Sequence, residues 1–154
     1  MEIPALRELV GELAGTPTRW SHLVRHDAGQ RVFERLVDEE DVEAWLICWM
    51  PGHDTGFHDH DLSSGAVSVV RGSVLEERLG IGQTSSRIYT PGQTFDFTSA
   101  EIHRVTHAGD IGAVTVHAYS PRLRRMGAYA VTRDGALQRH ALGYGEELRP
   151  VTIA

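Results

Sequence analysis

Short segments of strand-like composition, separated by glycine and proline, follow one another along the middle of the chain. The segments lie at residues 31–37, 43–50, 66–70, 73–79, 86–89, 94–97, 102–106, 113–119 and 128–131. Turn pairs such as Pro51-Gly52, Pro91-Gly92 and Asp134-Gly135 punctuate the series. Many short strands at fairly even spacing are typical of all-β folds. The pattern therefore predicts a mainly β protein, built as a double-sheet jelly roll or a small barrel.

The two ends of the chain differ from this β pattern. Residues 3–14 repeat apolar side chains at helical spacing, with Pro4 in the first turn and Gly15 at the stop. A second short helix is expected around residues 17–24. We therefore expect one domain over residues 1–154: a helical N-terminal segment at 1–26, a β-barrel at 31–132 and a C-terminal tail at 133–154. The tail has no clear pattern, and it could close the mouth of the barrel or form an interface.

Charge and composition exclude several classes of function. The formal net charge is −6 and no lysine–arginine cluster stands out, which argues against a nucleic-acid partner. The apolar run at residues 44–50 is far too short to cross a bilayer, and the N-terminus lacks the pattern of a signal peptide. The single cysteine, Cys48, excludes an internal disulfide and is expected to be a buried packing residue. A cytoplasmic protein without a membrane partner is the expectation.

His58 and His60 stand two residues apart in a glycine-bounded stretch of strand-like sequence. Alternate residues of a strand point to the same face, so both imidazoles can bind one metal ion. The spacing from Gly52 through both histidines to Gly65 and Gly72 resembles the first motif of the cupin superfamily, small β-barrels with a metal inside. The second cupin motif supplies one more histidine, and His103 is the best candidate because it lies in a strand-like segment.

The expected ligand set has no carboxylate, because glycine occupies position 65, where most cupins carry a glutamate ligand. Three neutral imidazoles leave a divalent ion with its full charge and with open positions. Such a site suits a substrate that brings an anionic donor, for instance a thiolate, and it leaves room for O2. The chemistry favours Fe(II), whereas affinity alone would favour copper or zinc. No organic cofactor is expected.

The remaining histidines are expected in turns, at the surface or behind the ligands. They are His22, His26, His53, His107 and His140. Asp59 alternates away from the metal face, so we expect a strand-surface or turn residue rather than a ligand.

Thr115, His117 and Tyr119 share one face of a strand that is otherwise built from alanine and valine. A buried hydroxyl, imidazole and phenol in a row can form a hydrogen-bond chain, and such groups are costly to bury unpaired. This favours a functional site. The alternative, that this face points to water as on any half-exposed strand, stays open at the level of spacing.

Taken together these motifs resemble the cysteine dioxygenase family, a cupin branch that oxidises thiols to sulfinates. The resemblance covers about residues 31–129 and rests on Ile47-Cys48-Trp49, the segment with His58 and His60, Ile102-His103-Arg104-Val105, and Val116 to Pro121. It implies that His58, His60 and His103 hold Fe(II). It also implies that Thr115, His117 and Tyr119 form the family's hydroxyl–imidazole–phenol triad, with Tyr119 orienting or protonating the reacting groups. Arg35 matches the arginine that binds the substrate carboxylate.

Four departures from the family pattern bear on the substrate and cofactor. Gly65 stands where animal members carry a cysteine that crosslinks to the tyrosine equivalent to Tyr119, so no crosslink is expected. Phe33 replaces a tyrosine, Asp61 follows the second histidine where many bacterial members have a small residue, and His107 stands where asparagine is frequent.

The expected function is oxidation of L-cysteine by O2 to cysteine sulfinate in an Fe(II)-dependent thiol dioxygenase, a monomer or small homo-oligomer. One alternative is another small thiol, such as 3-mercaptopropionate, or another cysteine-derived product. A second is a non-enzymatic metal-binding cupin sensor. A zinc or nickel isomerase or hydrolase ranks last, because such cupins usually keep the glutamate that Gly65 replaces.

Overall fold

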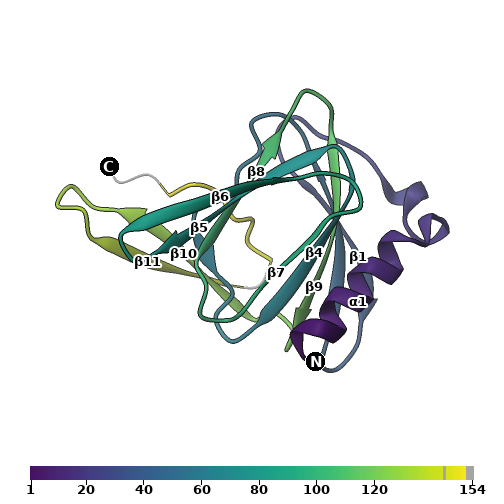
Figure 1. Ribbon diagram of the computed structural model, residues 1–154, viewed down its shortest axis with the longest axis horizontal. Helices are drawn as coiled ribbons and strands as arrows, with labels where there is room; N and C mark the ends of the chain where they lie inside the picture. Colours follow the sequence, from purple (N-terminus) through teal and green to yellow (C-terminus); the bar gives the residue numbers. More distant parts are fainter. Residues whose placement is uncertain (144, 152–154) are drawn as a thin grey trace.

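Two antiparallel sheets face each other in a computed structural model, which describes residues 1–143 and 145–151 (Figure 1). The first sheet has the order β1 (Val32–Asp38), β2 (Glu43–Trp49), β9 (Ala113–Ser120), β4 (Ser64–Arg71) and β7 (Thr94–Phe97). The second has the order β11 (Leu137–Gly143), β10 (Arg125–Val131), β3 (His58–Asp59), β8 (His103–Ala108), β5 (Ser73–Gly80) and β6 (Gln83–Tyr89). The predicted mainly β, double-sheet architecture is confirmed.

The N-terminal helix α1 (Ile3–Ala14) covers the outer face of the first sheet (Figure 1). Its buried face carries Leu6, Val10 and Leu13, which pack in one core with residues such as Cys48 and Val116. Cys48 is 1% exposed there, so its predicted packing role agrees with its position. The expected second helix is instead two 3-10 turns, η1 (Pro17–Arg19) and η2 (Ser21–Leu23). Between them the backbone of Trp20 is not helical (φ −139°, ψ −16°), and its indole N–H donates to the Leu13 carbonyl.

A second core lies between the two sheets. Strands β2 and β9 send alternate residues to the two cores, because successive side chains of a strand point to opposite faces. Ile47, Trp49 and Tyr119 belong to the inner core, whereas Leu46 and Ala118 face α1. Strand β9 is thus buried on both faces along its whole length. Thr115, His117 and Tyr119 share the face of β9 that points between the sheets and not to water.

The predicted tail contributes more structure than its sequence indicated. Residues 137–143 form β11, which pairs with β10, and after Gly143 the chain returns toward the sheets (Figure 1). Six of the seven β11 residues are exposed. The strand therefore has no buried face, and its sequence lacks the alternation of apolar and polar residues that would predict a strand. Among the described residues, no helix is both long and apolar enough to cross a membrane.

Candidate metal centre

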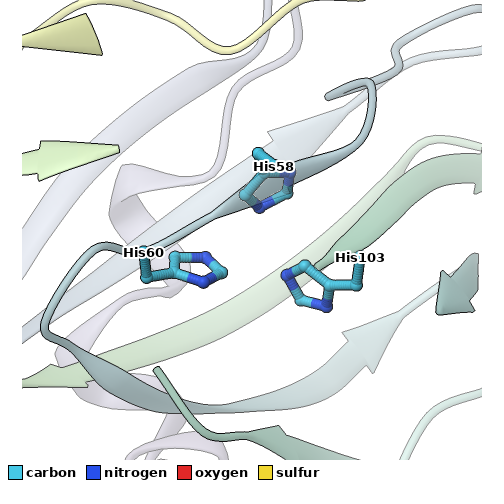
Figure 2. A group of neighbouring side chains, drawn as sticks. All are labelled: His58, His60 and His103. Carbon is cyan, nitrogen blue, oxygen red and sulfur yellow. The ribbon is translucent and has the colours of Figure 1, made fainter. Parts of the chain in front are cut away.

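His58, His60 and His103 come together at one point between the sheets. His58 in β3 pairs in register with His103, the first residue of β8, and His60 follows β3 directly. One possible ligand atom from each residue lies within 4.8 Å of the others, and all three side chains are buried. Figure 2 shows the three rings converging from these segments. The structure therefore assembles the three residues that the sequence proposed as ligands.

Hydrogen bonds fix the orientation of two of these imidazoles. Nδ1 of His58 lies 2.9 Å from the Gly56 carbonyl oxygen, and Nδ1 of His103 lies 2.7 Å from Oε2 of Glu76. A carbonyl and a carboxylate accept, so each Nδ1 carries the proton and each Nε2 keeps its lone pair for a metal. Glu76 is 3% exposed, and its other oxygen accepts from Arg78 at 2.9 Å.

His60 lacks such a partner. Its Nδ1 is buried and has no hydrogen-bond partner among the described residues. Burial, and after it the neighbouring imidazoles, lower the pKa of His58 and of His60 well below the usual range. Both rings are therefore neutral at physiological pH, which is the form that binds metal. An orphaned nitrogen in a cluster of buried imidazoles fits a bound metal ion, and imidazole donors suit iron as they suit zinc and copper.

We expect Glu76→Gln to weaken metal binding without removing a ligand. The amide still accepts from Nδ1 of His103 but is neutral, so the imidazole becomes a poorer donor. Loss of such an outer partner typically costs about 10- to 100-fold in metal affinity. Fe(II) affinity by competition with a chelator measures it. Glu77→Gln, one residue on and on the opposite face of β5, is the matched control, and equal affinities for both variants would contradict the role of Glu76.

The aromatic ring of Phe97 fills the space that a fourth ligand would need. Phe97 stacks on His60 with ring centroids 4.2 Å apart, and a Cβ built on Gly65 would lie 2.4 Å from the ring. The same Cβ would lie 2.9 Å from the carbonyl oxygen of Ala118. Gly65 pairs in register with Tyr119, which is the position from which a crosslink would form. The sole cysteine lies in the other core, at Cys48.

Gly65→Cys is therefore expected to destabilise the fold and to leave Tyr119 unmodified. Overpacking of a close-packed core costs about 1–3 kcal/mol, because Phe97 must shift. Thermal unfolding measures the loss, and intact mass after exposure to iron and O2 detects a crosslink as the loss of two hydrogen atoms. Gly11→Cys, in open space on α1, is the control. Full stability together with a crosslink would contradict the packing argument.

A hydrogen-bond chain runs along β9 beside the histidines. Nε1 of Trp49 donates to Thr115 Oγ1 at 2.9 Å, Thr115 Oγ1 lies 2.7 Å from Nε2 of His117, and Nδ1 of His117 lies 3.1 Å from the Tyr119 hydroxyl. The Thr115 hydroxyl contacts the Ile47 carbonyl only at 3.5 Å, so its proton goes to Nε2 of His117. The imidazole then carries its proton on Nδ1 and donates to Tyr119, whose own hydroxyl proton is left for the cavity.

The electrostatics of this chain keep both titratable members neutral. Burial, followed by the charge of Arg31, lowers the pKa of His117 to about 3. Burial, followed by the charge of Glu43, raises the pKa of Tyr119 above the usual range of a phenol. The Tyr119 ring lies 5.5 Å from that of His60. A protonated phenol thus stands next to the candidate metal ligands.

The histidine cluster, His117 and Tyr119 line one cavity of about 760 Å³, and Thr115 contacts His117 from outside the lining. Its wall also contains Arg31, Trp49 and Phe33. Arg35 is not among the lining residues. Its Nη1 donates to Asp38 at 2.9 Å, and its guanidinium carbon lies 4.5 Å from the centroid of the Trp45 ring. The structure thus brings together every predicted site residue except Arg35.

Most residues that we expected in turns, at the surface or behind the metal ligands lie as expected. His26, His53 and His107 contact backbone carbonyls, and His22 and His140 are exposed. Asp59 points away from the metal ligands as expected, but it is buried and not at the surface. Arg139 and Tyr129, at 2.8 and 2.5 Å, bond to its carboxylate. Arg139 lies on β11, a strand that the sequence did not reveal.

Several residues of the site were missed. Glu76 supports His103, Phe97 fills the space beside Gly65, and Arg31 and Glu147 meet in the cavity wall. Only Arg31 could have been found from the sequence. Residues 31, 33 and 35 are spaced by two in a strand-like segment, so Arg31 and Phe33 share the face of Arg35. The others depend on contacts between distant segments.

Comparison with known proteins places the chain. A sequence model of the family described as cysteine dioxygenase type I matches residues 2–132. Human cysteine dioxygenase type 1 is 26% identical in an alignment of 117 residues that covers 68% of this chain but only 58% of the human protein.

Two solved structures of lower identity share the fold. The protein TT1209 from Thermus thermophilus is 18% identical, with a TM-score of 0.60 over 66% of this chain and 93% of its own. A Klebsiella pneumoniae protein with a double-stranded β-helix domain is 17% identical, with a TM-score of 0.57 over 66% of this chain and 80% of its own. The cupin fold class is confirmed, and the chain belongs to the cysteine dioxygenase type I family.

Proposed function

We propose that this protein is an Fe(II)-dependent thiol dioxygenase that oxidises L-cysteine with O2 to cysteine sulfinate. The observation that carries the proposal is the joint position of three buried imidazoles and a protonated phenol on one cavity of a member of this family. The imidazoles suit a metal, and the phenol suits proton donation.

His58, His60 and His103 would hold the iron. When bound, ferrous iron supplies the one-electron and O2 chemistry that protein side chains lack. In the overall reaction both atoms of O2 end on sulfur, and the sulfur provides all the electrons. No separate reductant and no organic cofactor are then required, and the partners are a small thiol and O2.

The side chains of β9 would position a proton. The Tyr119 hydroxyl holds it at the cavity surface, and His117 fixes the phenol by donating to its oxygen. Thr115 in turn fixes the tautomer of His117, with Trp49 bonded behind it. Preorganised donors of this kind act without rearrangement at the moment of reaction. The carboxylate-binding role of Arg35 stays a prediction from the family resemblance, because its guanidinium lies beside Asp38 and Trp45.

A second candidate function is dioxygenation of another small thiol. Phe33 lines the cavity, so the hydroxyl that a tyrosine would bring to the wall is missing. Arg35 also lies outside the cavity wall. Two features that the family resemblance associates with L-cysteine, the tyrosine hydroxyl and the side chain of Arg35, are therefore absent from the wall. 3-Mercaptopropionate is the first alternative to compare.

O2 consumption by anaerobically iron-loaded protein tests the proposal, with mass spectrometry of the product. We expect one O2 taken up per sulfinate formed with L-cysteine. Uptake only with another thiol would move the assignment to the second candidate. Bound iron without O2 uptake for any thiol would favour a metal-binding sensor and reject the dioxygenase.

A further inference from the structure

The buried arginine Arg31 lines the cavity, whereas the predicted Arg35 does not. Arg31 directly precedes β1 and is 5% exposed. Its guanidinium carbon lies 4.9 Å from the centroid of the Trp49 ring and 5.3 Å from that of Phe33, so two aromatic rings hold its position. Its charge contributes, after burial, to the lowered pKa of His117. Arg31 is thus a fixed cation in the wall of the cavity that His117 and Tyr119 also line.

The C-terminal tail supplies the counterion of this arginine. Oε1 of Glu147 accepts from the backbone N–H and from Nε of Arg31, each at 3.2 Å. The carbonyl of Leu148 accepts from Nη2, and Leu148 is itself 8% exposed. Nη1 of Arg31 makes no hydrogen bond to any described residue. The tail returns from β11 to the two sheets (Figure 1), and residues 145–148 line the cavity.

Glu147 has a second partner on the outer side. Its Oε2 accepts from Nη2 of Arg149 at 2.9 Å and from Nε at 3.3 Å. The Arg149 side chain is 62% exposed, so it can move with the carboxylate. Glu147 can therefore leave Arg31 without becoming an unpaired charge, whereas Arg31 is buried and needs an anion in its place.

Resting on the proposed function, we propose that Arg31 is the anion-binding residue of the cavity, and that Glu147 is a resident carboxylate that a carboxylated thiol replaces. The site already holds the chemical group that such a substrate would bring. A guanidinium binds a carboxylate through paired hydrogen bonds, and Nη1 with Nη2 offers such a pair once the tail withdraws. The tail then sets the preference for thiols with a carboxylate over thiols without one.

Anaerobic calorimetry of iron-loaded protein tests this with L-cysteine and with cysteamine, which has no carboxylate. In Glu147→Gln the amide keeps an acceptor for Nε but competes less for the cation. We expect L-cysteine to bind about tenfold tighter and cysteamine to stay within about twofold, as expected for a changed charge-assisted hydrogen bond. Glu8→Gln is the matched control, because that carboxylate is exposed on α1 and lies outside the cavity lining.

Arg31→Met completes the test. We expect it to weaken the binding of L-cysteine by at least about tenfold and to leave the binding of cysteamine little changed. Thermal unfolding and iron content show whether this variant folds. If Arg31→Met does not fold, the binding of L-cysteine and cysteamine to Glu147→Gln decides the test. Equal shifts for both thiols in Glu147→Gln, or no shift, would overturn the proposal. So would loss of the carboxylate preference in Arg35→Met but not in Arg31→Met, which would support Arg35. Because binding is measured without O2, absence of turnover would reject the dioxygenase and leave this result standing.

Discussion

His103→Ala is expected to abolish iron binding and, with it, thiol-dependent O2 uptake. The substitution removes one of three nitrogen donors, and no carboxylate belongs to the cluster as a substitute. His103 is also the one ligand of the cluster that a buried carboxylate supports, at 2.7 Å from Glu76. Two remaining imidazoles on a single short segment leave the ion mostly to solvent, so iron should be lost during gel filtration.

Iron content per chain and O2 uptake measure this result, and circular dichroism checks the fold. Glu76 keeps Arg78 as a partner when His103 is removed, so the buried carboxylate stays paired. His140→Ala is the matched control, because His140 is exposed on β11. Full iron content in His103→Ala would show that the three histidines are not the metal site.

The strands could be predicted because most of them have one face in a core. Strand β7 begins and ends at the predicted residues, 94 and 97, and β2 differs by one residue at its end. The metal ligands could be predicted for the same reason, since a spacing of two residues on a strand fixes a shared face. Local periodicity thus carries both the fold and the centre of the site.

The outer parts of the site could not be predicted, because they depend on polar contacts between distant segments. Arg31 and Glu147 are separated by 116 residues, and alternation could give only the face of Arg31, not its partner. Asp59 shows the limit of alternation, which gives the face of a side chain but not its exposure. Its burial depends on Arg139, from a strand that is exposed nearly throughout.

The orientation of the triad needed the whole fold. Spacing alone allowed Thr115, His117 and Tyr119 to face water, as on a half-exposed strand. Strand β9 lies in the middle of its sheet, between β2 and β4, and α1 covers the face opposite to the triad. Both faces of β9 are therefore buried, which excludes the alternative that the triad faces water.

Tyr119→Phe is expected to lower kcat by about 100-fold or more while iron content stays that of the wild type, the range for loss of a positioned acid. The substitution removes one hydroxyl and keeps the ring beside His60 and Phe97. His117 then loses the acceptor of its Nδ1 proton, and the cavity loses the proton of the phenol. KM for L-cysteine should change less than kcat, because the hydroxyl acts on reaction more than on binding.

Tyr129→Phe is the matched control, since its hydroxyl also bonds to a buried group but lies outside the cavity lining. We expect it to leave kcat unchanged and to lower stability by about 1 kcal/mol, because Asp59 loses one of its hydrogen bonds. Steady-state O2 uptake and thermal unfolding of both variants separate the two effects. An unchanged kcat in Tyr119→Phe would restrict the triad to packing. A low kcat with wild-type iron content and stability would assign the proton at this cavity to Tyr119, because nothing but its hydroxyl differs.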